Sequence, residues 1–182
     1  MTTISKILEE EHKDLEKYYH NIMDASSDDE QVRWQNQFTW ELTRHSIGEE
    51  LIVYPAFEKY LSEGKAMTDK DREEHQRAKE LLYTFQGLKP DQPEFADTLQ
   101  KIWEELLQHM KEEMREDMPT LEKALPDGES INLANEFLRT KNFVPTRSHP
   151  SAPDHPPFET VVGLLTAPID KLGDLFRRFP KD

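Results

Sequence analysis

The sequence predicts an all-α fold, an up-down-up-down four-helix bundle followed by a Pro-rich linker and a C-terminal helix that straps back onto the bundle. Apolar residues recur with a period near 3.6 residues, and strand-like alternation is nearly absent. Charged residues make up 33% of the 182 residues and glycines number only six, which is typical of long helices with one solvated face. Short connections between four such helices favour antiparallel neighbours.

Proline, glycine and capping residues define the expected elements. The four helices are predicted at residues 4–22, about 29–63, about 68–87 and about 93–126. Ser5 is the expected N-cap of the first helix, and the acidic turn at 26–29 ends it. Gly64 is the expected C-cap of the second helix, whereas Pro55 and Pro119 predict kinks in the second and fourth.

Residues 1–126 are therefore predicted as the bundle domain and residues 127–182 as a C-terminal extension. The extension is expected to contain a short helix at Ile131–Thr140, a linker at 142–157 with five prolines, and an amphipathic helix at 158–179. The apolar stripe of the last helix consists of Phe158, Val161, Val162, Leu165, Ile169, Leu172, Phe176 and Phe179. We expect this stripe to pack on the bundle; the alternative is a surface for a protein partner or a membrane.

Composition excludes several functional classes. The chain has 23 Lys and Arg against 37 Asp and Glu, a net charge of −14, which is the opposite of an electrostatic nucleic-acid binder. It has no cysteine, so disulfides, thiolate ligands and thiol nucleophiles are excluded. No apolar run approaches the ~18 residues of a membrane span, and no secretory signal is visible. We expect a cytoplasmic protein without a nucleic-acid partner or a membrane span.

The candidate functional residues, histidines and glutamates, lie in an internal repeat. An offset of 64 residues superposes His45, Glu49 and Pro55 on His109, Glu113 and Pro119. An offset of 63 residues superposes Glu11-His12 on Glu74-His75. The chain is thus a duplicated helical hairpin, in which each half reads Glu-His and then His-x-x-x-Glu.

The spacing of the repeated residues indicates a metal site. Residues i and i+4 of a helix lie roughly 40° apart, so each His-x-x-x-Glu presents a nitrogen and a carboxylate on one face. Apolar neighbours at core spacing turn these faces inward, where unpaired ionisable groups are strongly destabilising unless they bind a metal. A single His-x-x-x-Glu is commonplace, whereas four inward histidines in a repeat are not. The predicted ligands are His12, His45, Glu49, His75, His109 and Glu113.

This pattern resembles the hemerythrin-like family, the HHE cation-binding domain, whose motif is His, His-x-x-x-Glu, His, His-x-x-x-Glu over four helices. The resemblance covers residues 1 to about 126 and implies a non-haem di-iron centre with two bridging glutamates. The Pro-rich segment and last helix are similar to the C-terminal extension of fungal members.

The sequence departs from the oxygen-carrying hemerythrins at one ligand. Their fifth histidine follows the third-helix histidine by one turn, and Lys79 stands at that place here. Four histidines, two bridging glutamates and a bridging oxygen leave two positions open on two six-coordinate metals. Reversible oxygen carriage is therefore in doubt. Glu16 is a candidate additional ligand, and Lys79 is either a hydrogen-bond donor to a bound oxygen species or a lysine that extends to solvent.

Three functions follow from these expectations. The first is a di-iron protein that handles or senses O2, peroxide, nitric oxide or iron; the second is a redox enzyme that consumes peroxide or nitric oxide. The third is a metal-free helical interaction domain. Only the resemblance indicates iron as the metal, because His and carboxylate ligands also accept Mn and Zn. The expected partner is a small diatomic or peroxide ligand, with a protein partner for helix 158–179 as a further alternative.

Overall fold

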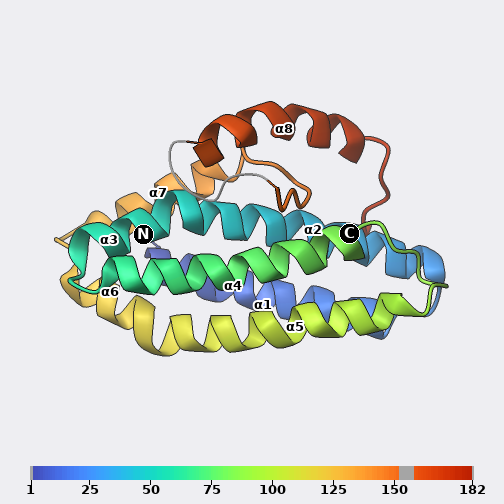
Figure 1. Cartoon of the computed structure of the whole chain (residues 1–182), viewed down its shortest axis with the longest axis horizontal. Coiled ribbons are helices and arrows are strands. Elements are labelled where there is room, and N and C mark those ends of the chain that lie inside the picture. The colour runs from blue at the N-terminus through green and yellow to red at the C-terminus, as the bar shows by residue number, and fades with distance from the viewer. Residues whose placement is uncertain (1, 152–157, 182) are drawn as a thin grey trace.

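The computed structural model describes residues 2–151 and 158–181; for residues 158–165 it describes the backbone but not the side chains. Every regular element in the described residues is a helix, so the predicted all-α bundle is confirmed. Four long helical segments lie side by side (Figure 1). They consist of α1 (Ile4–Met23), α2 (Asp28–Gly48) with α3 (Tyr54–Tyr60), α4 (Gly64–Phe85), and α5 (Glu94–Glu112) with α6 (Met118–Ala124).

The first helix begins with a different cap from the predicted one. Thr3 is the N-cap of α1, and its side-chain oxygen accepts a hydrogen bond from the Lys6 amide at 3.3 Å. The prediction of Ser5 as N-cap was wrong, because the Ser5 hydroxyl instead donates to Glu122 Oε1 at 2.6 Å. This bond ties the start of α1 to α6 at one end of the bundle.

The connection between the second and third helical segments also differs from the prediction. Gly64 is the first residue of α4, not a C-cap; α3 ends at Tyr60, and the extended residue Leu61 follows it. The third helix therefore starts at Gly64 rather than at Thr68. The chain turns back so tightly that a Cβ on Gly64 would lie 2.0 Å from the Phe57 carbonyl oxygen. Only glycine fits this close approach.

A π-helical turn precedes each of the two prolines at which a kink was predicted. These turns are η1 (Glu49–Val53) and η2 (Glu113–Asp117). The Tyr54 amide donates to the Glu49 carbonyl and the Met118 amide to the Glu113 carbonyl, five residues back in each case. Because proline lacks an N–H and its ring crowds the carbonyl four residues earlier, the wider turn lets the helix continue into α3 and α6.

Two apolar clusters fill the bundle, one on each side of the repeated His and Glu residues. One cluster includes Leu15, Ile22, Phe38, Leu42, Phe85, Phe95, Leu99, Ile102 and Leu106. The other includes Ile4, Leu8, Val53, Tyr54, Phe57, Met118, Leu121, Leu133 and Phe137. Along α1, for example, His12 lies between Leu8 of one cluster and Leu15 of the other. The predicted ligands thus form a polar layer within an apolar interior.

The first part of the C-terminal extension packs into the bundle. Helix α7 (Glu129–Thr140) buries Leu133, Ala134 and Phe137 in the second cluster, against α1 and η1. No regular helix or strand occurs in the described residues 141–151, as the prolines predicted, and the rest of the linker, 152–157, lies outside the described residues. The domain boundary after residue 126 stays a prediction.

Helix α8 (Phe158–Asp174) lies on the outside of the bundle (Figure 1) and ends before the predicted residue 179. Ile169 and Leu172 of α8, and Phe176 just after it, do not pack on the bundle as predicted: they are 70%, 62% and 89% exposed, whereas Ala167 is buried and Phe179 is partly buried. The side chains of Phe158, Val161, Val162 and Leu165 lie outside the described residues.

Polar contacts hold the last turns of α8 instead. The buried Asp170 carboxylate accepts hydrogen bonds from the backbone amides of Thr146 and Arg147 at 3.1 and 3.2 Å. Asp174 accepts a further bond from the Thr146 hydroxyl at 2.6 Å. Within the described chain no helix is both long and apolar enough to cross a membrane.

We expect Gly64→Ala to lower the free energy of unfolding by about 1–3 kcal/mol, because the added methyl group would overlap the Phe57 carbonyl. Thermal unfolding measures this change. Gly87→Ala is the matched control, since a Cβ there meets its nearest atom at 3.6 Å. Equal melting temperatures for the two variants would contradict the close approach.

Candidate metal centre

The six predicted ligands come from four helical segments and meet in the polar layer. His12 lies on α1, His45 on α2, His75 on α4 and His109 on α5. Glu49 and Glu113 are the first residues of the π-helical turns η1 and η2. All six are buried, with exposed fractions from 0% for Glu49 to 8% for His12.

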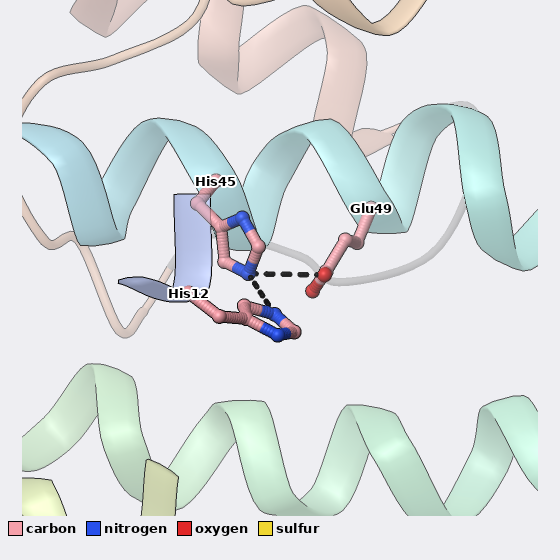
Figure 2. Close-up of side chains that lie close together, drawn as sticks. All are labelled: His12, His45 and Glu49. Atoms are coloured by element: carbon pink, nitrogen blue, oxygen red, sulfur yellow. Dashed lines mark hydrogen bonds and ion pairs between the residues drawn. The ribbon is translucent and has the colours of Figure 1, made fainter. Parts of the chain in front are cut away.

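Their side chains form two groups that share one carboxylate. His12, His45 and Glu49 form one group, and Glu49, His75 and His109 form the other, with potential ligand atoms within 4.8 Å of one another in each. Figure 2 shows the first group, in which His45 Nε2 lies 3.2 Å from His12 Nε2 and 3.0 Å from Glu49 Oε1.

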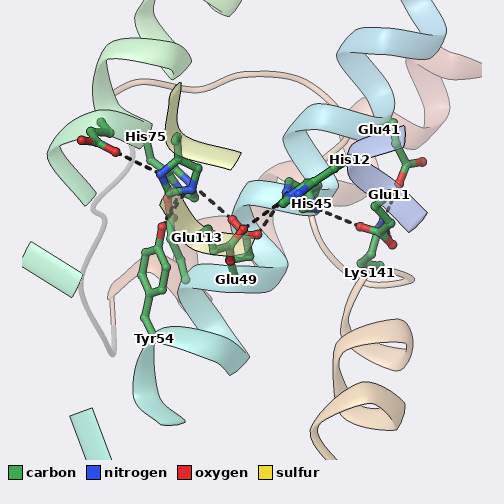
Figure 3. Close-up of polar contacts among 12 residues, drawn as sticks. Glu11, His12, Glu41, His45, Glu49, Tyr54, His75, Glu113 and Lys141 are labelled. Carbon is green, nitrogen blue, oxygen red and sulfur yellow. Dashed lines mark hydrogen bonds and ion pairs between the residues drawn. The ribbon is translucent and has the colours of Figure 1, made fainter. Parts of the chain in front are cut away.

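The other contacts complete a pseudo-symmetric arrangement around the shared carboxylate. Glu49 Oε2 lies 3.3 Å from His75 Nε2, which in turn lies 3.3 Å from His109 Nε2. Glu113 lies beside Glu49, with its Oε2 atom 3.3 Å from His12 Nε2. Figure 3 shows Glu49 and Glu113 between His75 on one side and His12 with His45 on the other.

The unsatisfied atoms of this layer fit a metal. Both carboxylate oxygens of Glu49 and both of Glu113 are buried without a hydrogen-bond partner among the described residues. Buried carboxylates in this state are costly, and a cation is the partner that four imidazole nitrogens and two carboxylates suit. The donor set is that of Fe, Mn or Zn.

Three further glutamates orient the histidines from outside the layer. In each case a histidine Nδ1 atom contacts a carboxylate: His45 with Glu11 at 2.9 Å, His109 with Glu74 at 3.0 Å, and His75 with Glu50 at 3.1 Å. Such contacts fix the tautomer that presents Nε2 to the centre of the layer. The sequence analysis placed Glu11 and Glu74 in the repeat without giving them this role, and it missed Glu50.

Comparison with known proteins identifies the family. The family described as the hemerythrin HHE cation-binding domain matches residues 3–121. The chain belongs to the hemerythrin HHE cation-binding family. The resemblance inferred from the His and Glu pattern is therefore confirmed, and cation binding is the function that the family description gives to the domain.

Two relatives extend the comparison. A hemerythrin-like protein of the fission yeast Schizosaccharomyces pombe is 54% identical over 181 residues, which cover 99% of this chain and 89% of that protein. This match runs through the C-terminal extension, as the similarity to fungal members implied. A DNA nickase of Nostoc sp. is 21% identical over 144 residues, 79% of this chain and 40% of that protein. No solved structure gives a significant match to the chain.

Lys79 and Glu16, the two residues that the sequence suggested as additional groups at the metal site, both lie away from the candidate ligands. Lys79 neither reaches the polar layer nor extends to solvent: its Nζ atom lies 2.6 and 2.7 Å from the two oxygens of Glu50, and its side chain is 16% exposed. Glu16 is exposed and belongs to neither group of candidate ligands. Tyr54, which the sequence analysis missed, places its hydroxyl 3.1 Å from His75 Nε2.

A cleft reaches the HHE site from one side. It has a volume of about 540 Å³, and the His12 ring is part of its wall. Its lining is largely apolar, with Trp103, Leu107, Met110 and Met114, and also includes the charged residues Glu9, Lys13, Glu16, Lys111 and Arg115. The His75 side is occupied instead by Glu50, Lys79 and Tyr54.

In the metal-free site, protons on the histidines supply the positive charge that a metal cation would otherwise supply. Burial would lower the pKa of His45, but the negative charge of Glu49 and the charge and hydrogen bond of Glu11 raise it to about 10. His109 is affected in the same way by Glu74 and Glu113, and its pKa is raised to about 9. Burial opposes ionisation of Glu49, yet the adjacent imidazoles hold its pKa well below the usual value. Metal binding must therefore displace protons from these histidines.

The melting temperature of the metal-free protein is expected to fall as the pH rises from 6.5 towards 9. The folded-state pKa values of His45 and His109 lie above the usual 6.5 of histidine, so their stabilisation is complete below pH 6.5 and is lost as the pH approaches 9–10. Asp71, whose pKa burial raises to about 7, also favours the folded state less as the pH rises, but its effect ends near pH 7 and adds only at the lower edge of this range.

The iron-loaded protein should not follow this fall, because its histidines are already deprotonated ligands and proton competition weakens as the pH rises. Calorimetry of both forms across this range measures the difference between their melting temperatures. A difference that narrows with rising pH would contradict the assignment of these histidines as ligands.

Proposed function

We propose that the protein binds two iron ions through His12, His45, Glu49, His75, His109 and Glu113 and uses this centre to handle or sense a small ligand. The observation that carries the proposal is the shared position of Glu49, whose carboxylate belongs to both groups of candidate ligand atoms. A carboxylate between two histidine pairs suits a bridging role between two metals. The family supports a cation, and the donor set supports iron with Mn or Zn as alternatives.

The proposed ligand is O2, peroxide or nitric oxide. When bound, the two iron ions would supply open coordination positions and redox chemistry for a ligand of this size. The chain's own residues provide the rest: Glu11, Glu50 and Glu74 orient imidazoles, and the cleft beside His12 gives a small molecule a route from solvent towards the polar layer. Lys79 forms an ion pair with Glu50, so its role is to help Glu50 orient His75 rather than to contact the small ligand.

The alternative function is enzymatic: a redox enzyme that consumes peroxide or nitric oxide at the same centre. It predicts turnover that increases in proportion to iron content and disappears in His45→Ala. A carrier or sensor predicts a reversible spectral change with O2 or nitric oxide and negligible turnover. A metal-free interaction domain predicts that iron removal leaves the melting temperature unchanged, whereas a ligand that binds only the folded state raises it.

Glu49→Gln should reduce bound iron from about two per chain to below one, because the shared carboxylate would become a neutral amide. Metal analysis after purification without chelator measures the loss. Glu16→Gln is the matched control: Glu16 is exposed and belongs to neither group of candidate ligands. Iron contents that are equal in the two variants would contradict the bridging assignment.

Leu107→Trp should slow the binding of nitric oxide to the iron-loaded protein, because the larger side chain narrows the cleft beside His12. Stopped-flow absorption measures the association rate, with a decrease of about tenfold expected from about 1.4 kcal/mol of added barrier. Leu81→Trp is the control, since Leu81 is also partly buried against the first cluster but lines a different pocket. Equal rates for both variants would exclude this cleft as the route.

A further inference from the structure

A buried lysine from the C-terminal extension contacts the carboxylate that orients His45. Lys141 follows α7 directly, and its side chain is only 4% exposed. Its Nζ atom lies 2.6 Å from Glu11 Oε1 and is also paired with Glu41 of α2. Glu11 in turn contacts His45 Nδ1 through its other oxygen, at 2.9 Å. Figure 3 shows this unbroken series of contacts from Lys141 to the polar layer.

The same end of α7 also contacts the His45 ring. Phe137 meets this ring edge to face, with centroids 6.3 Å apart and planes at 81°, and Lys141 Nζ lies 5.7 Å from the centre of the phenyl ring. Phe137 packs so closely on α2 that a Cβ on Gly48 would lie 2.7 Å from its Cε2 atom. The Lys141 carbonyl accepts a hydrogen bond from Arg44 Nε at 2.9 Å, which fixes the lysine backbone to α2.

In the other half of the repeat, Lys79 holds Glu50 beside His75, but Glu74, the counterpart of Glu11, has no buried lysine beside it among the described residues. Glu74 orients His109 as Glu11 orients His45, but the lysine near Glu74 is Lys70, which is 56% exposed and 3.6 Å away. An exposed ion pair contributes little, because water and salt screen it. A buried lysine between two carboxylates is different: its removal leaves Glu11 with only the His45 ring and Glu41 with only Arg44, at 3.7 Å, as a positive partner. The equivalent glutamates Glu11 and Glu74 are thus held by lysines of very unequal burial.

We infer that Lys141, with Phe137, is a positioning element by which the C-terminal extension holds His45 in its metal-binding orientation. Both residues lie outside the family match at 3–121, so the extension completes a site whose ligands all belong to the HHE domain. The inference rests on the proposed metal centre. It makes retention of the metal on the His12–His45 side dependent on a segment that contributes no ligand.

Loss of Lys141 should release Glu11 and, with it, the His45 ring. We expect Lys141→Met to accelerate iron release to a chelator by about tenfold, the lower end of what loss of an orienting partner costs at a metal site. Lys141→Arg keeps the cation and should restore slow release. Lys70→Met is the matched control, the same change beside the other orienting glutamate, and should leave release at the wild-type rate.

The double variant Lys141→Met with Glu41→Gln covers the case in which the single variant does not fold, because it also neutralises one of the two carboxylates that Lys141 contacts. It should still release iron rapidly, whereas Glu41→Gln alone should not. Melting of the metal-free forms separates orientation from general stability: a variant that lowers the melting temperature but releases iron at the wild-type rate would overturn the inference. Wild-type protein that holds no iron would instead overturn the proposed function and this inference with it.

Discussion

Six ionisable side chains lie between two apolar clusters inside one helical bundle, and the rest of the structure depends on how their burial is compensated. Glu49 and Glu113 are almost fully buried, and their carboxylate oxygens have no hydrogen-bond partner among the described residues. A buried carboxylate without a counter-ion costs several kcal/mol, and four imidazoles in the same layer add to that cost. The apolar clusters must hold this layer together until a cation, or protons on the histidines, compensate it.

The two halves of the repeat differ in the groups that surround their buried histidines. Around His75 the structure places Glu50, Lys79 and Tyr54, so that this side is filled with polar contacts. Around His12 the corresponding space is an open, largely apolar cleft, and His12 Nδ1 is buried without a partner among the described residues. The two halves of the repeat thus supply equivalent sets of candidate ligands but surround them differently, with polar contacts on one side and a cleft on the other.

The clustering of the candidate ligands could be predicted from the sequence because the signal was repeated. Helical periodicity and the offset of 64 residues placed His45 and Glu49 on an inward face, and the structure brings all six candidate residues into one layer; that they bind a metal stays a prediction. The orienting residues were harder to predict. Glu11 and Glu74 precede their neighbouring histidines in each half, yet each contacts a histidine of another helix, which periodicity does not reveal. Lys141 has no counterpart in the repeat.

The errors in the fold prediction also have physical reasons. Gly64 was assigned to a helix end on its usual preference, whereas the structure uses its missing side chain to bring α4 close to the Phe57 carbonyl. The apolar spacing of Ile169, Leu172 and Phe176 predicted a buried face, but buried Asp170 fixes α8 through backbone amides with those residues outward. Polar anchoring of this kind depends on three-dimensional placement, which hydrophobic periodicity does not contain.

The two π-helical turns affect how the two halves of the site are aligned. Each begins at a candidate ligand, Glu49 or Glu113, and ends two residues before a proline. A π-helical turn holds more residues than an α-helical turn, so the residues beyond it are rotated about the helix axis. Because the two turns occupy equivalent positions of the repeat, α3 and α6 are rotated in the same sense, and the pseudo-symmetry of the polar layer is kept in the helical segments that follow it.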